Sequence, residues 1–232
     1  MIPYLLLMKL ALLQPCLIPD LHYLSAVLKA DQIFIQDTER YSRKGRVHRF
    51  QVRGVESRQW VQLPVRTEDK KKQIREVRID HEQNWFEHIA KVLKVNYANS
   101  IYYEFYEPEI LADFEKLKQK TYLIDAIRYI NHQLAEYFEI NWDELDVQCQ
   151  SQTQFETNDP DVIVEHFGAD VLYQEHKGRN YQRQSSKAIP ALNNHPEYRQ
   201  HFGNFMEDCS LLDLLFERGS ESFRVFDEIL GD

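Results

Sequence analysis

The sequence is poor in cysteine, and its few cysteines lie far apart. Cys16, Cys149 and Cys209 are odd in number, and none forms a CxxC or Cys/His pair with metal-ligand spacing. The pattern therefore indicates neither a disulfide framework nor a zinc site. We expect reduced, buried thiols in a cytoplasmic protein.

Glycine and proline are also scarce, and acidic residues outnumber basic ones. The chain has 28 Lys and Arg against 37 Asp and Glu, a formal net charge of −9, with 7 Gly and 8 Pro. Proteins that bind nucleic acid through phosphate contacts normally present a basic face, so we expect no nucleic-acid partner. The one lysine run, 70–72, follows two acidic residues. We interpret it as a solvated loop, with an anion site as the alternative.

No long apolar run is present. The apolar stretch at residues 1–13 is interrupted by Lys9, lacks a preceding basic region and is too short to cross a bilayer. We therefore predict neither a signal peptide nor a membrane span. We interpret Met8 as the natural start, with residues 1–7 as an upstream extension.

Generic catalytic motifs are missing as well. The sequence contains no GxGxxG, P-loop, GxSxG or HExxH pattern. His195 and His201 lie near Cys209, but their spacing matches no class of metal site. We therefore predict no metal ion, and the cofactor, if one is used, stays unassigned.

The chain nevertheless has the pattern of a mixed α/β domain. A buried strand at 8–13, a helix from Asp20 and a second strand at 32–36 form a β-α-β unit, with polar residues just past both strand ends. Short strands at 46–53, 58–64 and 74–79 follow, the first two as a hairpin. We predict one domain over residues 1–232, with a mixed sheet of short N-terminal strands and a helical C-terminal half.

The second half is predominantly helical in pattern. Apolar stripes and helix-ending residues predict these further elements: helices from Trp85, at 106–118, 121–138, 160–167, 209–217 and 220–230, and strands at 145–149 and 170–174. Ser210 is the expected N-cap of the 209–217 helix, with Asp213 completing a capping box. A polar loop at 175–197, of a length that is often functional, separates the last strand from the closing helices.

Three segments could carry chemistry. In residues 36–49, carboxylates at a strand end meet four arginines and a lysine, which fits either an anionic-ligand loop or internal ion pairing. Residues 97–106 hold four tyrosines that could stack on a ring or pack in the core. Residues 196–219 combine aromatic and amide side chains with a capped helix that ends at Gly219, which packing alone can explain.

Taken together, these segments resemble the WbqC-like protein family. The pattern begins with Gln14-Pro15, Pro19 and Tyr23, continues through His48-Arg49 and Trp85, and closes with Tyr198, Gln200, Phe202, Gly203, Phe205 and the helix at 210–216. Nearly the whole chain is covered, with a weak match over 140–195. In two places the chain departs from the family pattern. His48-Arg49 replaces Asn-Arg, and Ile89 stands where relatives often carry histidine; His88 points about 100° away from that position on a helix.

The resemblance implies a role in polysaccharide biosynthesis. It suggests transfer of a small acyl or aminoacyl (glycyl) group to an amino sugar, as in O-antigen assembly, with a nucleotide sugar or another anionic small molecule as ligand. A non-catalytic ligand-binding or assembly protein of envelope biosynthesis is the alternative. The candidate catalytic residues are Asp37, Glu39 and Arg49. The candidate substrate-binding residues are Gln14, Tyr41, Arg43, His48, Tyr97, Tyr198 and Gln200.

Overall fold

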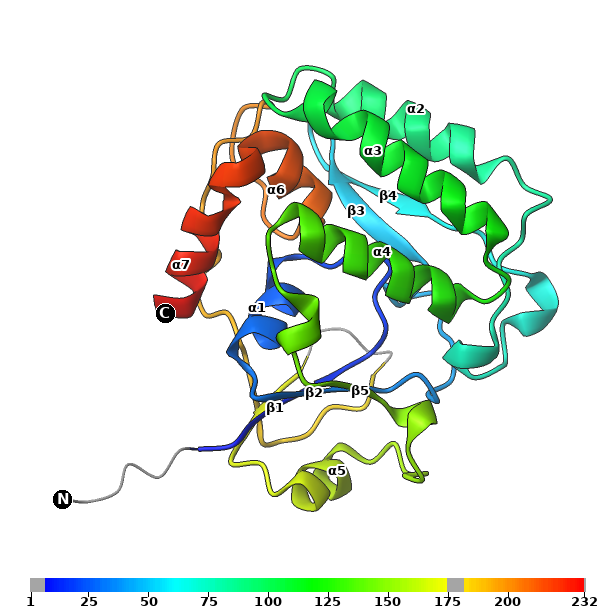
Figure 1. Ribbon diagram of the computed structural model, residues 1–232, viewed down its shortest axis with the longest axis vertical. Coiled ribbons are helices and arrows are strands. Elements are labelled where there is room, and N and C mark those ends of the chain that lie inside the picture. The colour runs from blue at the N-terminus through cyan, green and yellow to red at the C-terminus, as the bar shows by residue number, and fades with distance from the viewer. Residues whose placement is uncertain (1–6, 175–181, 232) are drawn as a thin grey trace.

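A five-stranded parallel sheet forms the base of the molecule. The computed structural model describes residues 7–174 and 182–231 (Figure 1). The sheet has the order β5-β2-β1-β6-β7. Its strands are β1 (Lys9–Leu13), β2 (Gln32–Ile35), β5 (Val147–Cys149), β6 (Val171–Tyr173) and β7 (Ala188–Ile189). All four pairings are parallel, so the carboxyl ends of the strands meet at one edge.

Helices cover both faces of this sheet. Leu10, Leu12 and Phe34 pack on one face against α5 (Pro160–Phe167). Ala11 and Leu13 point to the other face, toward α1 (Leu21–Lys29). Figure 1 shows the two helices on opposite sides of the strands. Because both faces are buried, the central strands β1 and β2 are apolar after their first residues, Lys9 and Gln32, as expected for a parallel sheet.

A second layer stands above the sheet. The antiparallel hairpin of β3 (Arg49–Arg53) and β4 (Arg58–Gln62) lies beside α2 and α3 (Figure 1). The remaining helices are α2 (Trp85–Tyr97), α3 (Tyr103–Lys116), α4 (Leu123–Tyr137), α6 (Leu211–Arg218) and α7 (Phe223–Gly231), with short 3₁₀ turns at Thr67–Asp69, Ile74–Glu76, Leu117–Gln119, Trp142–Glu144, Gln150–Gln152 and Gly219–Ser222. The largest core cluster joins the hairpin to these helices and to α1.

Local sequence explains where several helices begin and end. The side chain of Asp20 accepts a hydrogen bond of 3.0 Å from the backbone N–H of Tyr23 and so caps α1. Asp159 caps α5, which has Pro160 in its first turn. That helix ends at Gly168, whose φ of 60° is the left-handed conformation that glycine adopts readily.

The predicted fold class is confirmed, with corrections. The segment predicted as a strand at 74–79 is instead a 3₁₀ turn, Ile74–Glu76, followed by isolated bridges. Ile74, Val77 and Ile79 are buried as a strand pattern would require, but a turn buries them equally well. The predicted capping box at Ser210 is also wrong. Ser210 is the N-cap residue, but its side chain makes no capping hydrogen bond.

The structure differs in part from the loop predicted at 175–197. Residues 175–181 lie outside the described residues, as do residues 1–6 of the proposed upstream extension. The strand β7 lies within the predicted loop and extends the sheet next to β6. No helix in the described part of the chain is long and apolar enough to cross a membrane.

Candidate functional site

Polar side chains follow four of the five sheet strands at the carboxyl edge. Gln14 directly follows β1, Asp37 is the second residue after β2, Gln150 directly follows β5 and Gln174 directly follows β6, and all four are buried. From β1 the chain moves outward to β2 and β5, then returns to β6 on the other side of β1. Ligands of open α/β sheets bind outside this edge.

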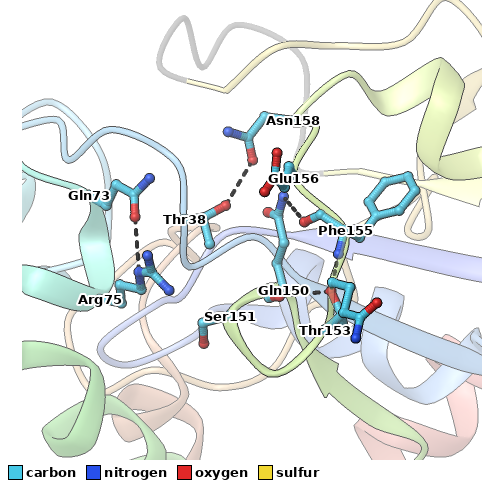
Figure 2. A pocket seen from close by; sticks show the side chains of 10 residues that line it. Thr38, Gln73, Arg75, Gln150, Ser151, Thr153, Phe155, Glu156 and Asn158 are labelled. Carbon is cyan, nitrogen blue, oxygen red and sulfur yellow. Dashed lines mark hydrogen bonds between the residues drawn. The ribbon is translucent and has the colours of Figure 1, made fainter.

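A cleft of about 740 Å³ opens at the ends of β2 and β5 (Figure 2). Its walls come mostly from the segments that follow these strands and from the turn at Ile74–Glu76. Seven of its ten side chains are uncharged hydrogen-bonding groups, and the other three are one aromatic ring, one carboxylate and one guanidinium. The lining residues are Thr38, Gln73, Arg75, Gln150, Ser151, Thr153, Gln154, Phe155, Glu156 and Asn158.

Beneath this cleft, Asp37 accepts hydrogen bonds from two groups of Ser151. The Ser151 backbone N–H donates to Oδ1 at 2.8 Å, and the Ser151 hydroxyl donates to Oδ2. Asp37 has no exposed surface, and Arg128 Nη2 lies 3.5 Å from Oδ2. A carboxylate so buried is stable when opposite charge and donors surround it. Asp37 therefore fixes the position of the Ser151 hydroxyl on the cleft wall.

A cysteine lies next to this pair but is not activated. Cys149 is the last residue of β5. Burial raises the pKa of its thiol, and this effect outweighs the opposite effect of the hydrogen bond with Arg128. A thiol with a raised pKa is a poor nucleophile at neutral pH. The Ser151 hydroxyl lines the cleft and donates to Asp37, whereas Cys149 is not among the lining residues, so Ser151 is the better candidate at this strand end.

Of the other predicted residues, Gln14 and Glu39 come together. The Gln14 side-chain amide donates to the Glu39 carboxylate, and both side chains are buried. The hydroxyl of Tyr23 donates to the Gln14 carbonyl at 3.1 Å. This pair lies at the same sheet edge as Asp37 but does not line the cleft. The catalytic role of Glu39 and the substrate-binding role of Gln14 stay predictions.

The basic segment folds largely onto itself. Arg49 donates to the carbonyls of Gly45 and Lys44 at 3.0 and 2.7 Å, and its guanidinium lies 4.0 Å from the centre of the Trp60 ring. A short, buried ion pair joins Arg46 to Asp20. These contacts support internal pairing for these two arginines. Arg49 does not line the cleft, and its catalytic role stays a prediction.

Tyr41 and His48 lie together inside the same segment. Their ring centres are 5.3 Å apart in an edge-on arrangement, and both side chains are buried. Burial, with a contribution from Arg49, lowers the pKa of His48 to about 4. Burial raises the pKa of Tyr41 well above its usual value. Both are therefore neutral at physiological pH. Arg43, in contrast, is exposed.

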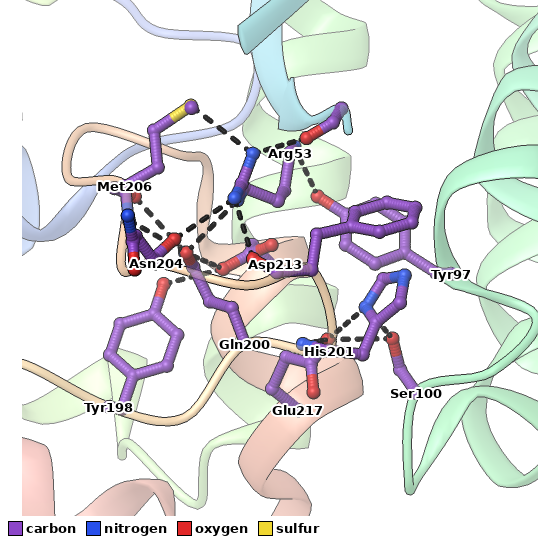
Figure 3. A network of polar contacts seen from close by, with 12 residues as sticks. Arg53, Tyr97, Ser100, Tyr198, Gln200, His201, Asn204, Met206, Asp213 and Glu217 are labelled. Atoms are coloured by element: carbon purple, nitrogen blue, oxygen red, sulfur yellow. Dashed lines mark hydrogen bonds and ion pairs between the residues drawn. The ribbon is translucent and has the colours of Figure 1, made fainter. Parts of the chain in front are cut away.

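Tyr198 and Gln200 converge on one buried carboxylate, Asp213 of α6 (Figure 3). The Tyr198 hydroxyl and the Gln200 amide each donate to Asp213 Oδ2 at 2.7 Å. The Tyr97 hydroxyl accepts from the backbone N–H of Arg53 at 2.8 Å. These contacts connect the hairpin, α2 and the chain before α6. They agree with the packing role that was one alternative for the segments 97–106 and 196–219.

Arg53 and His201 complete this polar network. Arg53 Nη2 donates to the carbonyls of Phe202 and Asn204 at 2.6 and 2.9 Å, and its Nε donates to Gln200. His201 Nδ1 lies 2.6 Å from a carboxylate oxygen of Glu217. Figure 3 shows these side chains directed at one another rather than into a cavity. The network fixes the chain at 198–206, and ligand binding by its members stays a prediction.

Apart from Thr38, which lies in the 36–49 segment, the cleft residues were not singled out from the sequence, Ser151 and Arg75 included. Gln150 and Ser151 directly follow the predicted strand 145–149, so the same strand-end rule that selected Asp37 could have selected them. Arg75 gave no such signal, because its segment was predicted as a strand. In the described part of the chain, no group of three or more His, Cys, Asp or Glu side chains could hold a metal ion.

The fold and the cleft define a parallel α/β protein with a polar site at the carboxyl edge of its sheet. The model of the WbqC-like protein family matches residues 14–225, and the chain belongs to that family. Membership implies a role in polysaccharide biosynthesis. Neither a curated protein nor a solved structure matches the sequence.

Proposed function

We propose that the chain transfers a small acyl or aminoacyl group, such as glycyl, to the amine of an amino sugar used in cell-surface polysaccharide. The observation that carries this proposal is the Ser151 hydroxyl, which lies on the wall of the polar cleft and donates to the buried carboxylate of Asp37. This pair is a route by which a proton can leave the reacting amine.

The chemistry requires one bond to form and one to break. The amine nitrogen forms a bond to the carbonyl carbon of the activated acyl group, and the bond from that carbon to the leaving group breaks. The nitrogen then loses a proton. Because the Ser151 proton already points at Asp37, the free lone pairs of Oγ can accept the amine proton as Asp37 accepts the serine proton. Of the predicted catalytic residues, Asp37 therefore has the best position.

The cleft also suits a sugar. Amide and hydroxyl side chains such as Thr38, Gln73 and Asn158 match the hydroxyl groups of a sugar, and Phe155 offers a ring on the same wall. Glu156 is the one carboxylate among the lining residues and could attract the ammonium form of an amino sugar. These features favour a polyhydroxylated amine over an apolar ligand.

The test is direct detection of the amide product. The protein is incubated with amino sugars, free and as nucleotide conjugates, together with glycyl and short acyl thioester donors, and the products are analysed by mass spectrometry. We expect Ser151→Ala to slow the reaction by roughly 100-fold or more, as for loss of a general base. The matched control is Ser57→Ala, since Ser57 is exposed in the β3–β4 turn.

Full turnover by Ser151→Ala would remove the proposed route for the proton. If an amino sugar binds in the cleft but no donor gives an amide, the transferase proposal fails. The alternative, a non-catalytic ligand-binding or assembly protein, would then be favoured.

A further inference from the structure

Arg75 stands between two clefts. It lines the cleft described above and a second one of about 370 Å³, which is also lined by Lys72, Glu76, Arg78 and Tyr122. The two clefts are therefore neighbours that share one side chain. A ligand longer than a single sugar could occupy both and pass Arg75 at the junction.

The other two cations of the second cleft are already paired. Lys72 Nζ lies 2.6 Å from Asp69, and Arg78 Nε lies 2.7 Å from the same carboxylate. Hydrogen bonding by Arg78 holds the pKa of Asp69 well below its usual range, so Asp69 stays charged. A further acid, Glu68, lies 3.3 Å from Arg78 Nη2. The carboxylates of Asp69 and Glu68 largely neutralise these two cations, which therefore attract an anionic ligand only weakly.

Arg75 differs from them. Its Nε donates to Gln73 Oε1 at 2.9 Å, which orients the guanidinium (Figure 2). Its two terminal Nη groups make no hydrogen bond within the described residues. It is also the only cation among the described residues that line the larger cleft. A fixed guanidinium with two free donor groups is suited to bidentate recognition of phosphate.

Tyr122 provides an aromatic surface on the second cleft. Its side chain is 43% exposed although the ring is large and apolar. A backbone bridge between Arg78 and Tyr122 fixes the residue just before α4. An exposed ring held on a rigid backbone can stack on a nucleobase, and such stacking tolerates different bases.

We infer that the sugar acceptor of the proposed reaction is a nucleoside diphosphate sugar that spans both clefts. The amino sugar lies in the larger cleft beside Ser151. The diphosphate binds the free fork of Arg75 at the junction, and the base stacks on Tyr122. This inference rests on the proposed function, because the larger cleft is taken as the place where the amine reacts.

The test is calorimetric binding of UDP, thymidine diphosphate, GDP and ADP, with glucosamine 1-phosphate for comparison. We expect at least one diphosphate to bind, and Arg75→Gln to weaken that binding by roughly tenfold or more, as for loss of a charged hydrogen-bonding group. The matched control is Arg224→Gln, since Arg224 is exposed on α7 outside both clefts.

Variants at Tyr122 test the base. Tyr122→Ala should weaken diphosphate binding by about tenfold, the usual effect of losing a stacked ring, and leave binding of glucosamine 1-phosphate unchanged. Tyr122→Phe should retain the affinity, because it keeps the ring. Equal losses for both probes in Tyr122→Ala would contradict stacking on the base.

Two results of the binding experiment would overturn the inference: no diphosphate binds at millimolar concentration, or Arg75→Gln binds as tightly as the unaltered protein. Amide formation on a free or lipid-linked amino sugar without nucleotide binding would overturn it and leave the proposed function standing. Nucleotide binding without any amide product would overturn the proposed function, and with it the role of the nucleotide sugar as acceptor, while the nucleotide site itself would stand.

Discussion

Asp213 shows how one buried residue can make stability depend on pH. Its carboxylate has no exposed surface, and burial raises its pKa to about 6 despite hydrogen bonds from Tyr198 and Gln200. The folded state therefore takes up a proton at higher pH than the unfolded chain does. The contribution of Asp213 to stability grows as pH falls through about 6 toward about 4. His48, whose pKa is lowered by burial, acts in the opposite direction between about pH 6.5 and 4.

Asp213→Asn should remove this dependence and retain an acceptor oxygen for Tyr198 and Gln200. The stability of the unaltered protein minus that of the variant should increase by on the order of 2 kcal/mol between about pH 7.5 and pH 4.5. Urea unfolding of both proteins at the two pH values measures this change. Because His48 is present in both proteins, its effect cancels when the two stabilities are subtracted. A constant difference would mean that Asp213 does not take up a proton in this range.

At the scale of residues, sequence reasoning selected one member of the Asp37–Ser151 pair on which the proposed function rests. Asp37 was selected because it follows a buried strand, and the structure places it beneath the cleft. Its partner Ser151 is 114 residues further along the chain. Only the pairing of β2 with β5 brings the two together, and strand order is not encoded in any local pattern. Arg75 and Tyr122 are brought onto one cleft by tertiary packing in the same way.

At the scale of elements, local chemistry predicted most helices and strands. Apolar periodicity located β1, α1 and β2, and Gly168 and Gly219 end α5 and α6 as expected. The failure at 74–79 has a clear cause. The apolar residues at 74, 77 and 79 show only that one side of the segment is buried, and a short extended run and a 3₁₀ turn can bury the same side chains.

Gly219, at the end of α6, has little room for a side chain. Its φ is 50°, and a Cβ atom there would lie 2.6 Å from the ring of Tyr102. Gly219→Ala should lower the free energy of unfolding by roughly 2–4 kcal/mol through strain and steric clash together. Gly203→Ala is the matched control, because Gly203 also has a positive φ but nothing lies within 4 Å. The free energy of unfolding of the Gly203→Ala variant should fall by only about 1 kcal/mol.

Denaturant unfolding of both glycine variants measures these losses. Equal losses would show that the ring of Tyr102 moves aside without a measurable effect on stability. The clash would then have no part in ending α6, and backbone strain alone would explain the choice of glycine.

At the scale of the whole molecule, the parallel sheet determines where chemistry can occur. The buried faces of the sheet carry apolar side chains, and its polar residues gather at the carboxyl edge. Composition and the β-α-β pattern predicted this class of fold. They could not predict that the cleft lies over β2 and β5, because those strands become neighbours only in the folded chain.

Hydrogen–deuterium exchange with and without the amino sugar nucleotide that binds most tightly tests the location of the site most directly. If the ligand binds in the larger cleft, exchange should slow in the peptides that line this cleft or lie beneath it. These peptides cover residues 36–39, 73–76 and 150–158. Protection confined to 43–49 or 193–207 would place the ligand elsewhere and would contradict the assignment of this cleft as the functional site.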